Sequence, residues 1–174
     1  MKVLILEVDS NELIRGIIKE GNAKEMPSVK DAWQFNFNKH SLPKDKTAFI
    51  LVKEDTPKII EGCMIFSMHD TFGPFMDYLE VAPHNKGSEG KYKRVSGCLI
   101  AYACGLSFEK GQDEDKGILT FKAFSNNEED QKKLEKLYRD KYGTVMNPWG
   151  YMEIHQNQSR LLIEEYLGDE DDLA

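Results

Sequence analysis

A single acid, Glu80, interrupts the apolar run Tyr78-Leu79-Glu80-Val81-Ala82. The residues around it, from Phe75 to Ala82, alternate in a mostly apolar pattern that predicts a largely buried strand. Burial removes the hydration of a carboxylate and favours its protonated form, so Glu80 could serve as a general base that takes up a proton. A glutamate at a solvated strand end would have no such role, and the sequence leaves both interpretations open.

A basic loop follows this strand and leads into a predicted helix. Pro83 ends the strand because it has no N–H to donate, and between His84 and Val95 four basic residues stand against one acid. Ser96 is a candidate N-cap for the helix, which carries one apolar stripe. Free N–H groups and the positive end of the helix dipole favour an anion at such a junction. The alternative is a loop that is simply solvated.

The order strand, basic loop, helix, strand and helix over roughly residues 60 to 155 resembles the GNAT superfamily of acyl-CoA-dependent N-acyltransferases. In that family a loop with the pattern Gln or Arg, two residues, Gly, one residue, Gly or Ala binds the pyrophosphate of coenzyme A. The resemblance assigns this role to Lys91, Tyr92, Lys93, Arg94, Val95, Ser96 and Gly97. Lys91 takes the first position, whereas Arg94 and Ser96 stand where glycines are usual and Gly97 follows one position late.

The resemblance also implies the roles of residues outside the loop. The segment YLEVAP is similar to the fourth strand of the family, so Glu80 would act as base, and the backbone of Leu79 and Val81 would contact the pantetheine arm and the thioester oxygen. The segment LEKLYRDKYG is similar to the helix whose tyrosine faces the thioester sulfur, which makes Tyr138 the acid for the leaving thiolate. A tyrosine at helical spacing is otherwise more often a core residue.

A set of aromatic residues falls in the region that would hold the acceptor substrate if the resemblance holds. Trp33, Phe35 and Phe37 would partly line that cleft, and core packing is the favoured alternative. The implied function is transfer of an acetyl group from acetyl-CoA, used as a co-substrate, to a primary amine by direct attack. The rival interpretation is a non-catalytic protein of the same fold that acts through a protein partner and binds CoA weakly or not at all.

Composition narrows the class of protein. The chain has 174 residues and a net charge of −7, and six acids without a base lie between Glu164 and Ala174. The rest of the chain is therefore nearly neutral, which argues against broad nucleic-acid binding. The chain has no apolar run long enough to cross a membrane, and its three cysteines form no CxxC. We expect reduced thiols in a cytoplasmic protein without a metal, as a monomer or a homodimer.

The predicted fold is α/β (α+β), with a mixed, mostly antiparallel sheet of six to seven strands flanked by helices. Residues 1–168 form one acyltransferase-like domain, and residues 169–174 an acidic disordered tail. The strand at Phe75 and the strand at Ile118 should run parallel because a helix connects them. The expected strands are Lys2–Val8, Thr47–Lys53, Lys58–Ser67, Phe75–Ala82, Ile118–Phe124 and Gly150–His155, and the expected helices are Ser10–Gly21, Ser28–His40, Ser96–Lys110, Gln131–Tyr142 and Ser159–Leu167. In Ser28–His40 the aromatic residues are spaced by two, which also fits a short extended segment.

Overall fold

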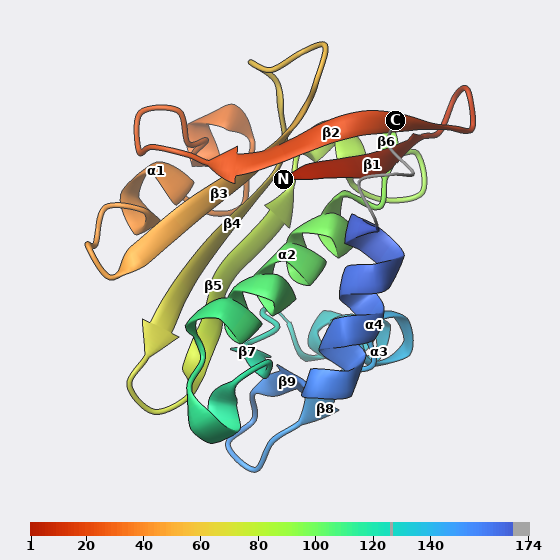
Figure 1. The fold of residues 1–174 in the computed structure, drawn as a ribbon. Helices are drawn as coiled ribbons and strands as arrows, with labels where there is room; N and C mark the ends of the chain where they lie inside the picture. Colours follow the sequence, from red (N-terminus) through yellow and green to blue (C-terminus); the bar gives the residue numbers. More distant parts are fainter. Residues whose placement is uncertain (126, 169–174) are drawn as a thin grey trace.

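The computed structural model describes residues 1–125 and 127–168, so the predicted acidic tail, 169–174, lies outside the described residues. One mixed sheet organises them (Figure 1). It has nine strands in the order β6-β1-β2-β3-β4-β5-β7-β9-β8, rather than the six to seven expected. The strands are β1 (Lys2–Glu7), β2 (Glu12–Glu20), β3 (Lys46–Lys53), β4 (Ile60–His69), β5 (Gly73–Val81), β6 (Tyr92–Lys93), β7 (Leu119–Phe121), β8 (Val145–Met146) and β9 (Met152–Ile154).

Antiparallel pairing dominates the sheet, as predicted. The exception is β5 with β7, which run parallel because a helix crosses between them. Two of the additional strands, β6 and β8, are only two residues long. The third additional strand is β2, in a segment that was expected to be helical.

The prediction of a helix from Ser10 to Gly21 is wrong. Residues 12–20 form β2, which pairs antiparallel with β1 on one side and with β3 on the other. Ile14 and Ile18 have a spacing that fits a helix, but both also fall on one face of a strand. The β-branched isoleucines favour the strand, and two paired neighbours make it the more stable choice.

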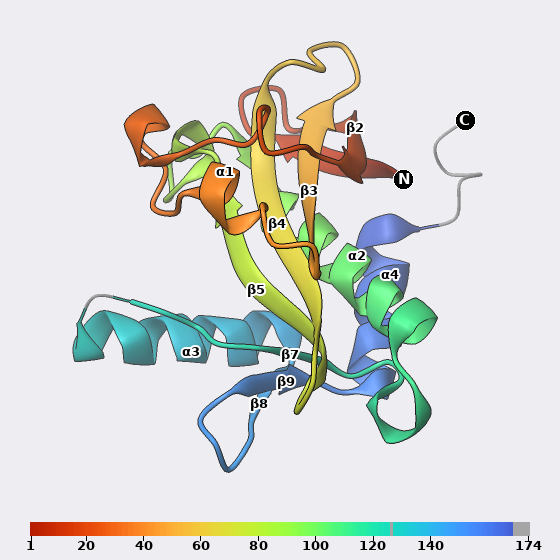
Figure 2. The same cartoon turned by 90° about the vertical axis from the view of Figure 1, so that its left-hand side faces the viewer.

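Four α-helices flank the sheet: α1 (Phe37–His40), α2 (Val95–Lys110), α3 (Glu128–Tyr142) and α4 (Gln156–Leu167). The expected helix from Ser28 to His40 is reduced to the 3₁₀ turn Val29–Asp31 and the short α1; two further 3₁₀ turns are Pro83–Asn85 and Asp113–Asp115. Figure 2 shows α2 and α4 on one face of the sheet, with α1 on the other and α3 projecting to the same side as α1.

The helix α2 is buried on two faces rather than along one stripe. One face packs on the sheet, and α4 covers much of the opposite face (Figure 1). Gly97 makes this close approach possible, since a Cβ there would lie 2.1 Å from the Tyr166 ring of α4. The helix also begins differently from the expectation, because Arg94 and not Ser96 occupies its N-cap position.

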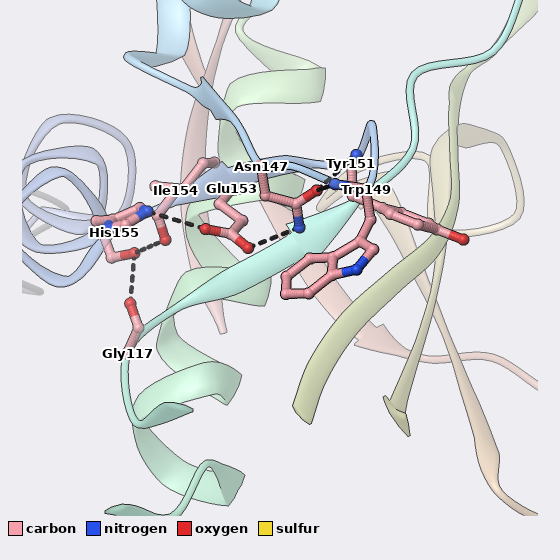
Figure 3. A network of polar contacts seen from close by, with 8 residues as sticks. Gly117, Asn147, Trp149, Tyr151, Glu153, Ile154 and His155 are labelled. Atoms are coloured by element: carbon pink, nitrogen blue, oxygen red, sulfur yellow. Dashed lines mark hydrogen bonds and ion pairs between the residues drawn. The ribbon is translucent and has the colours of Figure 1, made fainter. Parts of the chain in front are cut away.

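The hairpin of β8 and β9 closes the far edge of the sheet (Figure 3). The Oδ1 atom of Asn147 accepts hydrogen bonds from the backbone N–H groups of Trp149 and Tyr151, at 3.0 and 2.9 Å, while its Nδ2 donates to Glu153 at 2.8 Å. Glu153 in turn contacts His155 at 3.0 Å. This network fixes the hairpin that supports β7 on the side away from β5.

Candidate functional site

The strands β5 and β7 part after a short pairing. Within the described residues they pair only at Phe75 with Thr120 and at Met76 with Phe121, although β5 continues to Val81. At the same point the register between β4 and β5 shifts, so that Asp77 is an extra residue on β5. The chain after β7 leaves the sheet and runs along α3 (Figure 2). The backbone of β5 from Asp77 onward therefore has no β7 partner.

A cavity of about 540 Å³ lies at this parting of the strands. Its walls come from three parts of the fold: the segment before β3, the bulged part of β5, and the chain that follows β7 together with α3. The lining residues are Gln34, Phe35, His40, Met76, Asp77, Tyr78, Leu79, Phe121, Lys122, Ala123, Phe124, Leu134 and Tyr138. Apolar side chains share this lining with five titratable residues, His40, Asp77, Tyr78, Lys122 and Tyr138. An apolar cavity with a few polar groups is typical of a site for a small organic ligand.

Tyr138 lines this cavity from α3. Its ring packs edge-on against Phe121, with the ring centroids 5.1 Å apart. Asn127 caps the start of α3 by accepting from the N–H of Asp130, and Gly143 ends the helix in a left-handed conformation. Burial, with a smaller effect of Tyr142, raises the pKa of Tyr138 to about 12. The phenol is therefore a neutral hydrogen-bond donor at physiological pH.

Glu80 is buried, with 6% of its surface exposed, but it is not among the residues that line the cavity. Its carboxylate accepts hydrogen bonds from the backbone N–H groups of Gln34, at 2.7 Å, and Phe35, at 3.1 Å. Lys86 donates a third at 2.5 Å. The glutamate thus ties the segment before β3 to β5. The solvated strand end that the sequence left open does not apply.

The three aromatic residues of the same segment separate into two groups. Phe35 lines the cavity, whereas Trp33 and Phe37 are buried in the core between this segment and the sheet. Trp33 packs edge-on against Phe37 at 5.8 Å, and Phe35 against Tyr78 at 5.2 Å. Core packing is therefore the role of two of the three, and only Phe35 is placed to contact a ligand in the cavity.

The backbone contacts expected on β5 also divide. Leu79 lines the cavity, but Val81 lies further along the strand and does not. Residues 91–97, all of which the structure describes, lie outside the cavity as well. A ligand that reached both the cavity and the loop would have to extend along the unpaired edge of β5.

Arg94 adopts a left-handed backbone conformation, with φ of 69°. Its side chain turns toward β1 and α4: Nε donates to the carbonyl of Leu4 at 3.4 Å and an Nη to the carbonyl of Glu165 at 2.7 Å. The guanidinium also lies over the Tyr166 ring, 4.7 Å from its centroid. Among residues 1–125 and 127–168, no side chain caps the first turn of α2, so the N–H groups of Val95, Ser96 and Gly97 have no side-chain acceptor there and could bond an anion.

The rest of the loop is held by its own contacts. The Nζ atom of Lys93 donates to the carbonyls of Gly87 and Ser88, and the hydroxyl of Ser96 bonds that of Tyr142 at 2.9 Å. The ammonium group of Lys91 lies over the ring of Tyr92, 5.2 Å from its centroid. These lysines are near the first turn of α2 but have partners within the loop.

The base of the loop is fixed by a buried carboxylate, Glu61 of β4. It contacts His84 at 2.6 Å and accepts from Asn85 at 2.8 Å. Asn85 in turn accepts from the N–H of Tyr92 at 3.0 Å. This network was not predicted from the sequence, because Glu61 and the loop are more than twenty residues apart.

The sequence analysis also missed His40, which lines the cavity from the end of α1. Its imidazole stacks on the ring of Tyr78 with the centroids 4.2 Å apart. Burial and the nearby Lys46 lower its pKa below 6.5, against an opposing effect of Asp77. A lone histidine at a helix end has no sequence signature, so only the fold reveals its position.

In the part of the chain that the structure describes, no group of three or more histidine, cysteine, aspartate or glutamate side chains is arranged to hold a metal ion. No helix in the same residues is long and apolar enough to cross a membrane. The three cysteines are free and buried.

The sequence matches no family model and no curated protein. Several solved structures are nevertheless similar in fold. The AtaTR complex bound with AcCoA aligns with a TM-score of 0.56 at 14% identity, covering 84% of this chain and 97% of that one. The spermidine/spermine N-acetyltransferase SpeG from Vibrio cholerae gives 0.54 at 13%, covering 84% and 98%. The KacTA–DNA complex gives 0.59 at 11%, covering 86% and 99%.

Proposed function

We propose that this chain, which has the fold of the GNAT acetyltransferases, is an N-acetyltransferase that moves an acetyl group from acetyl-CoA to a primary amine. The observation that carries the proposal is the parting of β5 and β7 around a cavity that Tyr138 lines. The thioester would lie in that cavity, and the remainder of the cofactor would extend along β5 toward the first turn of α2.

The unpaired edge of β5 supports this placement. Its free backbone groups can bond the amide groups of a pantetheine arm as a neighbouring strand would. Leu79 lines the cavity on this edge together with Asp77 and Tyr78, and Val81 would contact the arm further along. The N–H groups of Val95, Ser96 and Gly97 would receive the pyrophosphate, helped by the dipole of α2. Lys91, Tyr92, Lys93 and Arg94 would shape this loop rather than supply most of the charge.

Tyr138 would protonate the departing thiolate. Direct attack of the amine forms the C–N bond and breaks the C–S bond, so the sulfur needs a proton as it leaves. A phenol with a pKa of about 12 remains protonated over the whole physiological range. The same desolvation raises the proton affinity of the thiolate that forms beside it, which keeps the transfer favourable.

Glu80 has a different place in the proposal from the one that its sequence context indicated. Its carboxylate already accepts three hydrogen bonds and lies outside the cavity. We infer that it positions Phe35 and the rest of residues 21–45, which would hold the acceptor amine and are called the acceptor segment here, rather than taking the proton itself. Trp33 and Phe37 would support this segment from the core.

Replacement of Tyr138 by Phe tests the proposed function. With acetyl-CoA and a panel of primary amines, thiol release by the wild-type protein should fall by about 10²-fold in the variant, because only the phenolic proton is lost. The affinity for acetyl-CoA should not change. Tyr102→Phe is the matched control, since Tyr102 lies on α2 and packs on Phe49 away from the cavity. Unaltered turnover in Tyr138→Phe would exclude the tyrosine as the acid.

A non-catalytic protein that acts through a partner is the second candidate. It is favoured by one observation, the commitment of the Arg94 guanidinium to the carbonyls of Leu4 and Glu165, which withdraws that charge from the loop. Absence of thiol release with every amine, together with no binding of acetyl-CoA, would support this candidate over the enzyme.

A further inference from the structure

We propose that His40 is the general base of this site and that it takes the proton from the acceptor amine as the amine attacks the thioester. The inference rests on the proposed acetyl transfer and deepens it by assigning the proton acceptor. The sequence analysis assigned that role to Glu80, so the two assignments predict different pH dependences for the variants of His40 and Glu80.

His40 lies in the wall of the cavity where the thioester is proposed to bind. His40 and Tyr138 line the same cavity from different elements, α1 and α3. A proton acceptor on one wall and a proton donor on another leave the reacting atoms between them, as acyl transfer requires. Glu80 does not line that cavity.

The imidazole of His40 is held in one orientation by stacking on Tyr78. Its face lies on the Tyr78 ring at an interplanar angle of 19°, and Tyr78 follows the bulge residue Asp77 on β5. Tyr78 is itself held by edge contacts with Phe35 and Phe37. The stacked ring is therefore fixed next to the point where β5 and β7 part. In the described residues, no hydrogen bond engages either ring nitrogen of His40, whereas the carboxylate of Glu80 accepts three.

The charged groups around His40 favour its neutral form. Lys46 of β3 and Asp77 of β5 form an ion pair next to it, Ser67 of β4 donates to the same aspartate at 2.6 Å, and Lys39 precedes it on α1. Burial and the two lysines lower the pKa of His40, and Asp77 only partly opposes them. The imidazole is therefore neutral at pH 7 and has a free lone pair for a proton.

The proton balance follows from these positions. The ammonium form of the acceptor loses its first proton to water before attack. The neutral amine then forms the C–N bond, His40 takes the second proton from nitrogen, and the C–S bond breaks as Tyr138 gives its phenolic proton to sulfur. The imidazolium finally returns its proton through water to the tyrosinate, which restores both groups. The products are the N-acetyl amine and the free thiol of CoA.

The pH dependence of kcat/KM for the amine tests this inference. The wild-type protein should show an acid limb with a midpoint below 6.5, set by protonation of His40. His40→Gln should lower kcat/KM by about 10²-fold and abolish that limb, with the affinity for acetyl-CoA unchanged. His69→Gln is the matched control, because His69 is exposed and lies outside the cavity. Glu80→Gln should keep the limb because His40 is still present, although the single carbonyl oxygen of Gln can accept only one of the two backbone hydrogen bonds, which go to different carboxylate oxygens.

Three outcomes would overturn the assignment. The first is a His40→Gln variant within twofold of the wild-type rate, the second is an unchanged acid limb in that variant, and the third is loss of the limb in Glu80→Gln instead. A wild-type protein that releases no thiol with any amine would refute the acetyl-transfer function itself, and this inference with it. That result differs plainly from an active wild type with an equally active His40→Gln variant.

Discussion

Arg94 shows how one residue can hold a conformation that its type disfavours. A non-glycine residue with φ of 69° places its Cβ close to backbone atoms, at a cost of about 1–2 kcal/mol. The cost is offset by the hydrogen bonds of the guanidinium to Leu4 and Glu165 and by its contact with the Tyr166 ring. Glycine is usual at this position in the family loop that the sequence resembles. The backbone of Arg94 has the left-handed conformation that glycine adopts without strain.

Two variants of Arg94 separate backbone strain from side-chain contacts. Arg94→Ala and Arg94→Gly both remove the guanidinium, but only alanine keeps a Cβ at positive φ. We expect the glycine variant to have the higher free energy of unfolding, by about 1 kcal/mol, in urea denaturation followed by circular dichroism. Equal stability of the two variants would show that this position is not strained.

At the scale of single residues, the sequence indicated those features that follow from the neighbouring residues in the chain. The apolar neighbours of Glu80 made burial one of two open interpretations, and the structure selects it, whereas the helix that carries Tyr138 was predicted from its periodicity and from Gly143. The partners of Glu80 could not be predicted, because Gln34 and Phe35 are about 45 residues away in the chain. His40 was missed for the same reason, since its surroundings come from β3 and β5.

At the scale of elements, the helix α2 is buried between the sheet and α4. It packs on the sheet with one face and against α4 with another, and it begins at the loop that is proposed to hold phosphate. Its sequence, VSGCLIAYACGLSFEK, has few polar residues before its last turn, which is what burial on two faces requires. The expectation of one apolar stripe was too narrow because the outer cover, α4, lies more than forty residues further along the chain.

Two glycines of α2 provide a matched pair of substitutions. Gly97→Ala would place a Cβ 2.1 Å from the ring of Tyr166 and should push α4 away, with a cost of about 1–3 kcal/mol. Gly105→Ala meets no atom within 4 Å and should stabilise the helix by about 1 kcal/mol. Thermal unfolding of both variants measures the two effects. A Gly97→Ala variant as stable as the wild type would show that α4 does not hold this close contact.

The first hairpin shows where element prediction failed. Ile14, Ile17 and Ile18 fit both a helix and a strand, and an isolated segment gives no means of choosing. The choice is made by β1 and β3, which pair with β2 along most of its length. The acceptor segment consequently lies between β2 and β3 and not between the first two strands.

At the scale of the whole molecule, one sheet separates two clusters of buried side chains. The larger lies under α2 and α4, and the smaller under the acceptor segment. The candidate cavity opens where β5 and β7 part and takes walls from both the acceptor segment and α3. The order of strands from β3 to β7 was predictable from the sequence, whereas the parting of β5 and β7 is a property of the assembled sheet that no local sequence pattern indicates.

Acetyl-CoA should stabilise the folded chain as a whole. A ligand that binds only the folded state at 100 times its Kd adds about 2.7 kcal/mol, which raises Tm by roughly 5–10 °C in a domain of this size. Differential scanning fluorimetry measures the shift, with an unrelated nucleotide cofactor such as NADH as the control. No shift at saturating acetyl-CoA would count against the enzyme and in favour of the non-catalytic candidate.

The small strand β6 connects the loop before α2 to the hairpin of β1 and β2. Tyr92 and Lys93 belong to the loop that is proposed to bind the pyrophosphate, yet they pair with Glu7 and Leu6 on the edge of β1. A substitution that weakens the pairing of β1 with β6 would therefore displace the residues that lead into the first turn of α2. The edge of β1 thus bears on the shape of a loop that lies far from it in the sequence.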